Sequence, residues 1–282
     1  RRGECIFFFC DHYRRCFSEN VMRKASRTPL VIANHAVVMI KAAHADDDLP
    51  SHLIFDEGHH IFDAADSSFG AALTGMEGFD LRRWLIGPEG GRKSRARGLK
   101  KRIEDLISGD NDAIRLMEEI VHKAHFLPLH DWLPRLRQGQ SQNSAETFLA
   151  NVYNQVWVRA EGKDGPYSLE TPVHPISDPV QLSAAKLRED LKALRAPMTR
   201  LAARLRQKLS EQTDTLAPDT RARLEAVAQS LERRVNNILT PWVDVLTSLE
   251  ETTVNESVVD WMEIERGENT VFDIGLHRHY ID

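Results

Sequence analysis

The stretch Leu53-Ile54-Phe55-Asp56-Glu57-Gly58-His59-His60 places two adjacent carboxylates directly after an apolar run, with a glycine and two histidines behind them. Short apolar runs that end in polar residues are typical of buried strands in α/β proteins. Nucleotide hydrolases use paired acids at such a strand end, one to hold a magnesium ion and one to polarise the attacking water. An ordinary strand followed by an acidic turn gives the same pattern, so this stretch alone leaves both interpretations open.

A second apolar run, Leu30 to Ala33, also ends in polar residues, Asn34 and His35. Helical patterns precede and follow both runs, and a strand–helix–strand–helix order is typical of a parallel α/β sheet. Ligands of such sheets bind beyond the carboxyl ends of the strands. We therefore expect Asn34 and His35 to lie close to the acidic pair, and the two runs to be strands.

From about residue 76 the pattern becomes helical. Helical spacing is present near 81–85, over 114–126 and over 145–158, whereas the glycines and prolines of 161–179 predict an irregular, extended excursion with a possible short hairpin. Two long stretches follow. Over 187–209 apolar residues recur alternately four and three positions apart, and 224–249 carries a similar apolar seam with steps of three and four. This heptad pattern predicts an antiparallel helical hairpin with its turn near 213–219, and a dimerising coiled coil is the alternative.

The last part of the chain returns to strand patterns. Val258–Glu265 and Val271–Ile274 alternate between apolar and polar residues, and Arg266–Asn269 between them has the composition of a turn. These residues predict a β-hairpin. The simplest organisation is an α/β domain that is interrupted by a helical insertion and then resumed by the hairpin.

All three cysteines, Cys5, Cys10 and Cys16, fall within the first sixteen residues. An odd, crowded group is unlike a disulfide framework and more typical of ligands to a metal or an iron–sulfur cluster. Such a site needs a fourth ligand, which would precede residue 1 or be His12 in a Cys3His zinc site. Three buried cysteines beside Phe7-Phe8-Phe9 are the structural alternative.

Composition and charge limit the number of domains and the classes of partner. The 282 residues are 41% hydrophobic and carry a net charge of −5, which allows two domains and gives no overall attraction to nucleic acid or membrane. The sequence contains no apolar run of membrane-spanning length, so we expect a cytoplasmic protein that binds no membrane. One local cluster is strongly basic, and it predicts either a solvated helix face or contacts with a phosphate backbone: Arg92, Lys93, Arg95, Arg97, Lys100, Lys101 and Arg102.

With these features placed, the sequence resembles the iron–sulfur helicases of superfamily 2, the group that contains XPD and the bacterial DinG helicases. Four segments carry the resemblance: Cys5-x4-Cys10-x5-Cys16, Leu30–Ala36, Ile54–His59 and Asp260–Glu263. The order and separation of the segments also fit, and the tight cysteine group is most like that of DinG. The middle of the chain resembles the group only in being a long helical insertion, as the arch domain of that family is.

The resemblance implies a division of the chain into four parts. Residues 1–17 would be a remnant of the iron–sulfur domain, and residues 18–75 part of a RecA-like motor domain one with a parallel sheet. Residues 76–253 would be an all-α, arch-like insertion, and residues 254–282 a β-hairpin that returns to the motor domain. Cys5, Cys10 and Cys16 would ligate a [4Fe-4S] cluster whose fourth cysteine precedes this chain.

The resemblance also assigns roles to individual residues. Asp56 would bind Mg²⁺, Glu57 would activate the hydrolytic water of Mg-ATP, and His59 would couple the nucleotide site to DNA. Asn34 and His35 would lie near the DNA path, and the basic run from Arg92 to Arg102 would face DNA. Gly58 stands where the family often has alanine.

The implied activity is ATP-dependent translocation on single-stranded DNA with 5′-to-3′ polarity, in DNA repair or replication. The partners would be single-stranded and forked DNA and the remainder of the helicase chain, in a monomer.

Two departures from the family limit this activity. The sequence contains no G-x-x-x-x-G-K-[ST] phosphate loop, and nothing in it matches the second motor domain. We therefore expect an internal fragment of a helicase that does not hydrolyse ATP by itself.

Two other function classes stay open. One is a non-catalytic nucleic-acid-binding or scaffold module built on the helical insertion. The other is a metal-dependent hydrolase that uses Asp56, His59, His60 and Asp63.

Overall fold

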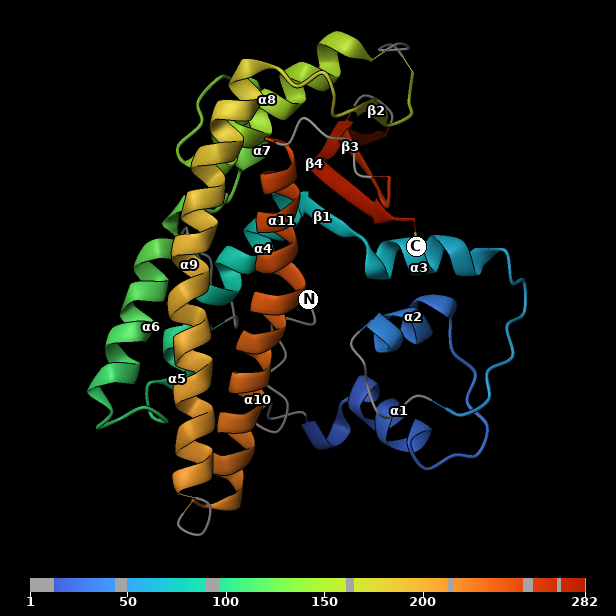
Figure 1. Cartoon of the computed structure of the whole chain (residues 1–282). Helices are drawn as coiled ribbons and strands as arrows, with labels where there is room; N and C mark the ends of the chain where they lie inside the picture. The colour runs from blue at the N-terminus through green and yellow to red at the C-terminus, as the bar shows by residue number, and fades with distance from the viewer. Residues whose placement is uncertain are drawn as a thin grey trace. The chain divides into compact units, whose positions relative to one another are not determined.

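The computed structural model of the chain (Figure 1) describes residues 13–43, 50–89, 97–160, 165–212, 216–250, 256–267 and 270–281. It divides the chain into two compact units. Residues 1–70 with 279–282 form the N-terminal unit, and residues 71–278 form the helical unit. In the described residues, no helix is both long enough and apolar enough to cross a bilayer.

The N-terminal unit is built from short elements. A 3-10 turn, η3 (Tyr13–Arg15), precedes three helices: α1 (Phe17–Ala25), α2 (His35–Ala43) and α3 (His60–Phe69). Helices α2 and α3 pack against each other. Neither α1 nor α2 has a fully buried residue. This unit therefore has little apolar core of its own among the described residues.

The helical unit contains most of the secondary structure. Its elements, in chain order, are β1 (Ala71–Thr74), α4 (Gly75–Leu85), α5 (Leu99–Ile103), α6 (Asn111–Lys123), the 3-10 turn η4 (Ala124–Phe126), α7 (Trp132–Arg137), α8 (Ser144–Arg159), β2 (Leu169–Pro172), α9 (Asp178–Glu211), α10 (Pro218–Arg234), the π-helical turn η5 (Val235–Leu239), α11 (Thr240–Ser248), β3 (Val258–Gly267) and β4 (Thr270–Tyr280).

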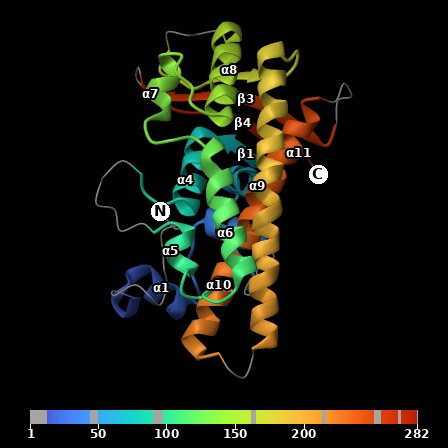
Figure 2. The same ribbon diagram turned by 90° about the vertical axis from the view of Figure 1, so that its left-hand side faces the viewer.

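Helix α9 is the centre of the helical unit because it contacts α6, α8, α10 and α11. Its buried residues include Leu187, Leu191, Leu194, Met198, Leu201 and Leu205, which repeat the predicted heptad spacing. Helices α10 and α11 run back alongside it (Figure 1), and α8 and α6 lie beside successive parts of it (Figure 2). The predicted antiparallel hairpin is thus confirmed, as are helices at the predicted positions of α4, α6 and α8.

The turn η5 joins α10 to α11 in one almost continuous rod. Pro241 follows it as an early residue of α11. Proline lacks a backbone N–H, and its ring collides with the carbonyl four residues earlier in a regular helix. A wider π turn directly before Pro241 accommodates both effects without ending the rod.

The sheet is antiparallel, with strand order β1-β4-β3-β2. Leu73 on β1 pairs with Leu276 on β4, and Leu169 on β2 pairs with Ile264 on β3; all four side chains are buried. Helix α8 packs on β2 and β3, and Trp242 of α11 donates its indole N–H to the carbonyl of Ala72, 2.7 Å away. The predicted β-hairpin is confirmed as β3 and β4, and the excursion at 161–179 contributes one strand to the same sheet.

The start of α4 is fixed from two sides. Thr74 Oγ1 accepts the backbone N–H of Glu77 at 3.2 Å, and the carboxylate of Asp273 on β4 accepts that of Met76 at 3.1 Å. These bonds satisfy amide groups that a helix leaves without internal partners. A side chain at Gly75 would collide with the ring of Trp132, so glycine permits the close approach of α4 and α7.

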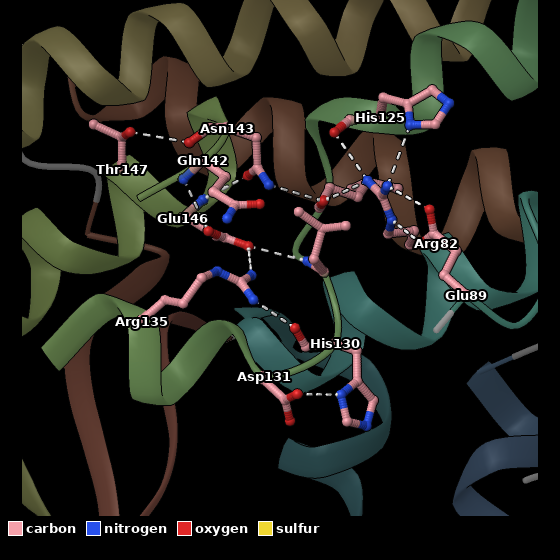
Figure 3. A network of polar contacts seen from close by, with 12 residues as sticks. Arg82, Glu89, His125, His130, Asp131, Arg135, Gln142, Asn143, Glu146 and Thr147 are labelled. Carbon is pink, nitrogen blue, oxygen red and sulfur yellow. Dashed lines mark hydrogen bonds and ion pairs between the residues drawn. The ribbon is translucent and has the colours of Figure 1, made fainter. Parts of the chain in front are cut away.

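A buried polar network (Figure 3) holds the loops that surround α7. Glu146 is fully buried, and its carboxylate accepts the backbone N–H groups of Leu129 (3.1 Å) and Gln142 (3.0 Å) and the guanidinium of Arg135 (2.5 Å). Arg82 is also buried, and it pairs with Glu89 while donating to the carbonyls of His125 and Leu127. We call Arg82, Glu89, Arg135 and Glu146 the loop network. Arg82, Arg135 and Glu146 each bond backbone groups of these loops, and Glu89 pairs with Arg82.

The structure differs from the sequence prediction at the two apolar runs of the N-terminal unit. Residues 31–34 and 52–55 are not assigned to strands, and Leu30, Ile32 and Ile54 are largely exposed. A strand needs a hydrogen-bonded neighbour, and among the described residues the sheet forms within the helical unit instead. The RecA-like parallel sheet and the arch-like character of residues 76–253 stay predictions.

The division of the chain also differs in detail from the predicted one. The boundary falls between Gly70 and Ala71 rather than at 75–76, and nearly all of the hairpin groups with the helices. The hairpin groups with the helices because its strand β4 pairs with β1, which begins the helical unit. The assignment of the hairpin to a motor domain stays a prediction.

Candidate functional site

The acidic motif lies in a turn that precedes a helix of the N-terminal unit. Residues 52–55 have no assigned secondary structure, 56–59 form bends and a turn, and α3 begins at His60. The N–H of His60 donates to the carbonyl of Glu57 at 3.0 Å, and that of Ile61 donates to Gly58 at 3.1 Å. These two bonds close the turn and hold both acids immediately before the positive end of the α3 dipole.

Glu57 has an unusual backbone conformation, with a φ of +49°. Residues with a side chain adopt this left-handed region at a cost in free energy, and such outliers are often found at functional sites. The next residue, Gly58, has no such requirement. A methyl group there would meet only Ile61, at the ordinary contact distance of 3.8 Å. The alanine that the helicase family often has would therefore fit this backbone.

Both acids of the motif face solvent. Asp56 is exposed, and the Glu57 side chain keeps 70% of its surface. Glu57 Oε2 lies 3.4 Å from Nδ1 of His59, whose own side chain is 67% exposed. An ion pair as exposed as this one contributes little to stability. The acids therefore stay available to a ligand.

Four aromatic rings connect this turn to the second polar motif. The rings of His59 and His60 lie 4.0 Å apart, His60 lies 6.4 Å from His35, and His35 stacks on Phe55 at 5.7 Å. Asn34 caps α2, because its Oδ1 accepts the backbone N–H of Val37 at 3.0 Å. The two motifs that the sequence placed together are thus neighbours, and Asn34 has a structural role that its sequence position did not reveal.

The acidic motif has donors that suit magnesium. Mg²⁺ prefers oxygen ligands and is usually held by one or two carboxylates together with water and substrate phosphates. Asp56 and Glu57 supply such oxygens. Within the described ranges, no three His, Cys, Asp or Glu side chains come close enough to form a metal site by themselves. The four-ligand metallohydrolase built from Asp56, His59, His60 and Asp63 is therefore not assembled.

The cysteine group can be placed only in part. Cys16 is a half-buried free thiol that directly precedes α1. Cys5, Cys10 and His12 lie outside the described residues. The iron–sulfur cluster stays a prediction.

The basic run belongs to the helical unit. Arg97, Lys100 and Lys101 are exposed, whereas Arg102 is half-buried on α5 with its guanidinium 5.9 Å above the ring of Trp84. Arg92, Lys93 and Arg95 lie outside the described residues. The structure adds a cation that no sequence motif indicates, since Arg234 of α10 lies 3.8 Å above the same ring. Its separation of 132 positions from Arg102 (234 − 102) leaves no local signal.

Comparison with known proteins gives one partial match. The ATP-dependent DNA helicase YoaA of Haemophilus influenzae is 32% identical over 83 residues. The chain is similar to part of a helicase. The match covers 27% of this chain but only 13% of YoaA, so it relates the chain to a helicase without covering the activities of the whole enzyme. No protein-family model matches the chain.

Proposed function

We propose that this chain is a segment of an ATP-dependent DNA helicase of the iron–sulfur XPD/DinG group and carries half of its ATP-hydrolysis site. The observation that supports the proposal most is the exposed Asp56-Glu57 turn with His35, His59 and His60 beside it. The similarity to YoaA supports the helicase class independently. The absence of a phosphate-loop motif from the sequence means that the other half of the site must come from elsewhere.

In this proposal the two acids have different tasks. Asp56 would hold Mg²⁺, which when bound offsets the negative charge of the ATP phosphates. Glu57 would orient the attacking water and accept its proton, since its carboxylate is exposed and its one ion pair within the described ranges is with His59. The left-handed backbone at Glu57 makes its conformation differ from that of an ordinary turn residue.

His59 is the residue that would link hydrolysis to DNA. Its imidazole contacts Glu57 on one side and stacks near His60 on the other, and His60 in turn approaches His35. A movement of Glu57 during hydrolysis would therefore reach the Asn34-His35 motif through direct contacts. The helicase would act as a monomer in the cytoplasm, on single-stranded and forked DNA in repair or replication.

The proposal is tested by Glu57→Gln in the longer helicase that contains this chain. Loss of the catalytic carboxylate should lower single-strand-stimulated ATP hydrolysis by about 10²- to 10⁴-fold, with ATP binding retained. Glu118→Gln, an equally conservative change of an exposed acid on α6, is the matched control and should leave hydrolysis unchanged. Full ATPase activity in Glu57→Gln would exclude the proposed role of this residue.

The proposed [4Fe-4S] cluster has its own test. Cys16→Ser should remove the brown colour and most of the bound iron from the longer protein, because a cluster of this kind needs four protein ligands. Iron content that stays unchanged in Cys16→Ser would exclude Cys16 as a ligand.

A further inference from the structure

His35 contacts the residues at both ends of the acidic turn. Phe55 is the last residue before the turn, and His60 begins α3 directly after it. The ring of His35 stacks on the ring of Phe55 with 5.7 Å between their centroids, and its centroid lies 6.4 Å from that of His60. Both distances are in the range of favourable aromatic pairs. We call His35, Phe55 and His60 the ring clamp, because together they bridge the turn that carries Asp56 and Glu57.

The burial of the ring clamp differs from that of its surroundings. Phe55 is half-buried, whereas every other residue from 51 to 60 is exposed. His35 is also half-buried, and it follows the exposed residues 26–34. Contact between the two rings removes ring surface from water, which favours the stacked arrangement. This contact therefore gives the acidic turn a packed neighbour.

Helices α2 and α3 fix the positions of the two histidines of the ring clamp. Asn34 Oδ1 accepts the backbone N–H of Val37 at 3.0 Å, which caps α2 directly before His35. Helix α2 packs against α3, whose first residue is His60. Two packed helices thus set the separation between His35 and His60, and Phe55 contacts His35 from the segment that enters the turn.

The turn between these rings needs support, because Glu57 has a φ of +49°. A backbone conformation of this cost persists only where neighbouring contacts hold it. Two backbone hydrogen bonds close the turn on the side of α3, from His60 to Glu57 and from Ile61 to Gly58. The ring clamp adds a contact at each end, through Phe55 before the turn and His60 after it. Loss of either ring contact would free one end of the turn.

We propose that the ring clamp positions the two acids of the turn for Mg-ATP, with His35 acting on both of them. Phe55 is bonded through the backbone to Asp56, so its contact with His35 limits the movement of the acid that would hold Mg²⁺. The assignment of Mg-ATP rests on the proposed helicase function, whereas the ring contacts do not depend on it.

The second contact of His35 acts on the other acid. The ring centroid of His60 lies 4.0 Å from that of His59, whose Nδ1 is 3.4 Å from Oε2 of Glu57. Direct contacts thus lead from His35 through two further rings to the carboxylate that would orient the attacking water. Catalytic groups must be held within about 0.5 Å of their productive positions. Loss of either ring contact should therefore lower activity, and it should do so in a different way for each acid.

Amide hydrogen exchange in this chain, followed by NMR, measures the ring clamp without nucleotide. His35→Leu removes the ring, so the amides of His60 and Ile61, whose N–H groups close the turn, should exchange about two- to tenfold faster, as expected for the loss of aromatic pairs. His35→Phe keeps a ring and should restore exchange close to the wild-type rate. His52→Leu is the matched control, since His52 is exposed, precedes the turn and has its Nδ1 2.9 Å from the hydroxyl of Ser51.

A Mg²⁺ titration of ATP hydrolysis by the longer helicase separates the two ring contacts. Phe55→Leu should raise the Mg²⁺ concentration at half-maximal rate by about two- to tenfold, with most of the lost rate returning at high Mg²⁺. His60→Leu should instead lower kcat by a similar factor at every Mg²⁺ concentration, because it acts through His59 on Glu57. Phe62→Leu, at a phenylalanine of α3 that is 73% exposed, is the control and should change neither quantity.

A double-mutant cycle tests whether the rings act together. Phe55→Leu should add little to the exchange rates in the His35→Leu background, because the two rings contact each other. Fully additive effects would overturn the inference, as would exchange in His35→Leu equal to that in His52→Leu. Unchanged Mg²⁺ dependence and kcat in both Phe55→Leu and His60→Leu would overturn it as well. Thermal unfolding of each variant monitors the fold, and Phe55→Leu carries the exchange test if His35→Leu does not fold.

The ring clamp and the proposed function are decided by different measurements. Hydrogen exchange needs no ATP hydrolysis, whereas the catalytic role of Glu57 is decided by Glu57→Gln in the longer helicase. Full ATPase activity in Glu57→Gln would exclude the proposed function even where the clamp holds the turn. A clamp that fails the exchange test would leave the proposed function in place.

Discussion

Glu57 and Glu146 are the same residue type in opposite settings. Glu146 is fully buried and accepts two backbone N–H groups and one guanidinium, so its charge is used entirely to hold loops. Glu57 keeps most of its surface, has a left-handed backbone and, in the part of the chain that the structure describes, pairs only with His59. A buried carboxylate with full coordination is structural, whereas an exposed one on strained backbone is ready for a ligand. The local setting of each acid, rather than its identity, separates the two roles.

The largest expected effect comes from making the same substitution in both places. Glu146→Ala should lower the free energy of unfolding of the helical unit by about 3–5 kcal/mol, because it leaves the guanidinium of Arg135, whose side chain is only 18% exposed, without its carboxylate partner. Nε of Arg135 already lacks a partner among the described residues. Glu57→Ala should change stability by less than about 0.5 kcal/mol, since it removes only exposed contacts.

Denaturant unfolding followed by circular dichroism measures both changes. Similar losses for Glu146→Ala and Glu57→Ala would contradict the distinction between structural and ligand-binding acids. Glu118→Ala serves as the reference for an exposed glutamate on a regular helix.

A smaller effect should appear in the pH dependence of the loop network. The guanidinium of Arg82 lowers the pKa of Glu89 below its usual value of 4.5. The resulting stabilisation is complete above pH 4.5, and it is lost as the pH falls from 4.5 through the folded-state pKa, because the unfolded chain takes up the proton first. Glu89→Gln should therefore make the melting temperature less sensitive to acid below pH 4.5.

Thermal melts across an acid pH series measure this effect. The Glu89 side chain is 32% exposed, so solvent screening keeps the effect modest. An unchanged slope in Glu89→Gln would show that the Arg82 pair does not contribute to acid sensitivity.

The smallest expected effect concerns the turn itself. Gly58→Ala should be neutral or should stabilise the N-terminal unit by about 0.4–1 kcal/mol, since alanine restricts the unfolded chain and meets only Ile61 at 3.8 Å. Hydrogen exchange of the amides of α3 measures this change locally. Faster exchange in Gly58→Ala would mean that the turn is more crowded than its contacts indicate.

The helical hairpin and the β-hairpin can be predicted from the sequence, whereas the two apolar runs of the N-terminal unit give a wrong prediction. Both outcomes have physical reasons. The heptads of α9 and of the α10–α11 rod were readable because an apolar stripe that packs on another helix repeats every three or four residues. The β-hairpin could be predicted because apolar and polar residues alternate along both of its strands, a pattern typical of half-buried strands. The runs at 30–33 and 52–56 were read as strands because they are apolar, yet a strand also needs a neighbour, which composition does not encode.

The candidate site shows the same contrast. The proximity of Asn34-His35 to the acidic motif followed from the predicted order of elements, although the strands that suggested it are not present. The left-handed backbone of Glu57 and the convergence of Arg102 and Arg234 on Trp84 depend on tertiary structure. Neither has a signal in neighbouring residues.

The π turn between α10 and α11 has a consequence for how the chain tolerates changes in length. The buried residues Leu231, Val235 and Leu239 follow one another at intervals of four positions. A heptad has one interval of four and one of three, so this segment contains one residue more than a heptad. The wider turn absorbs that residue, so α10 and α11 both keep their apolar side toward α9. Removal of one residue from 235–239 should give an unbroken heptad, whereas a deletion inside α9 would turn half of its stripe away from its partners. Natural length variation in this helical pair is therefore expected to collect at the π turn.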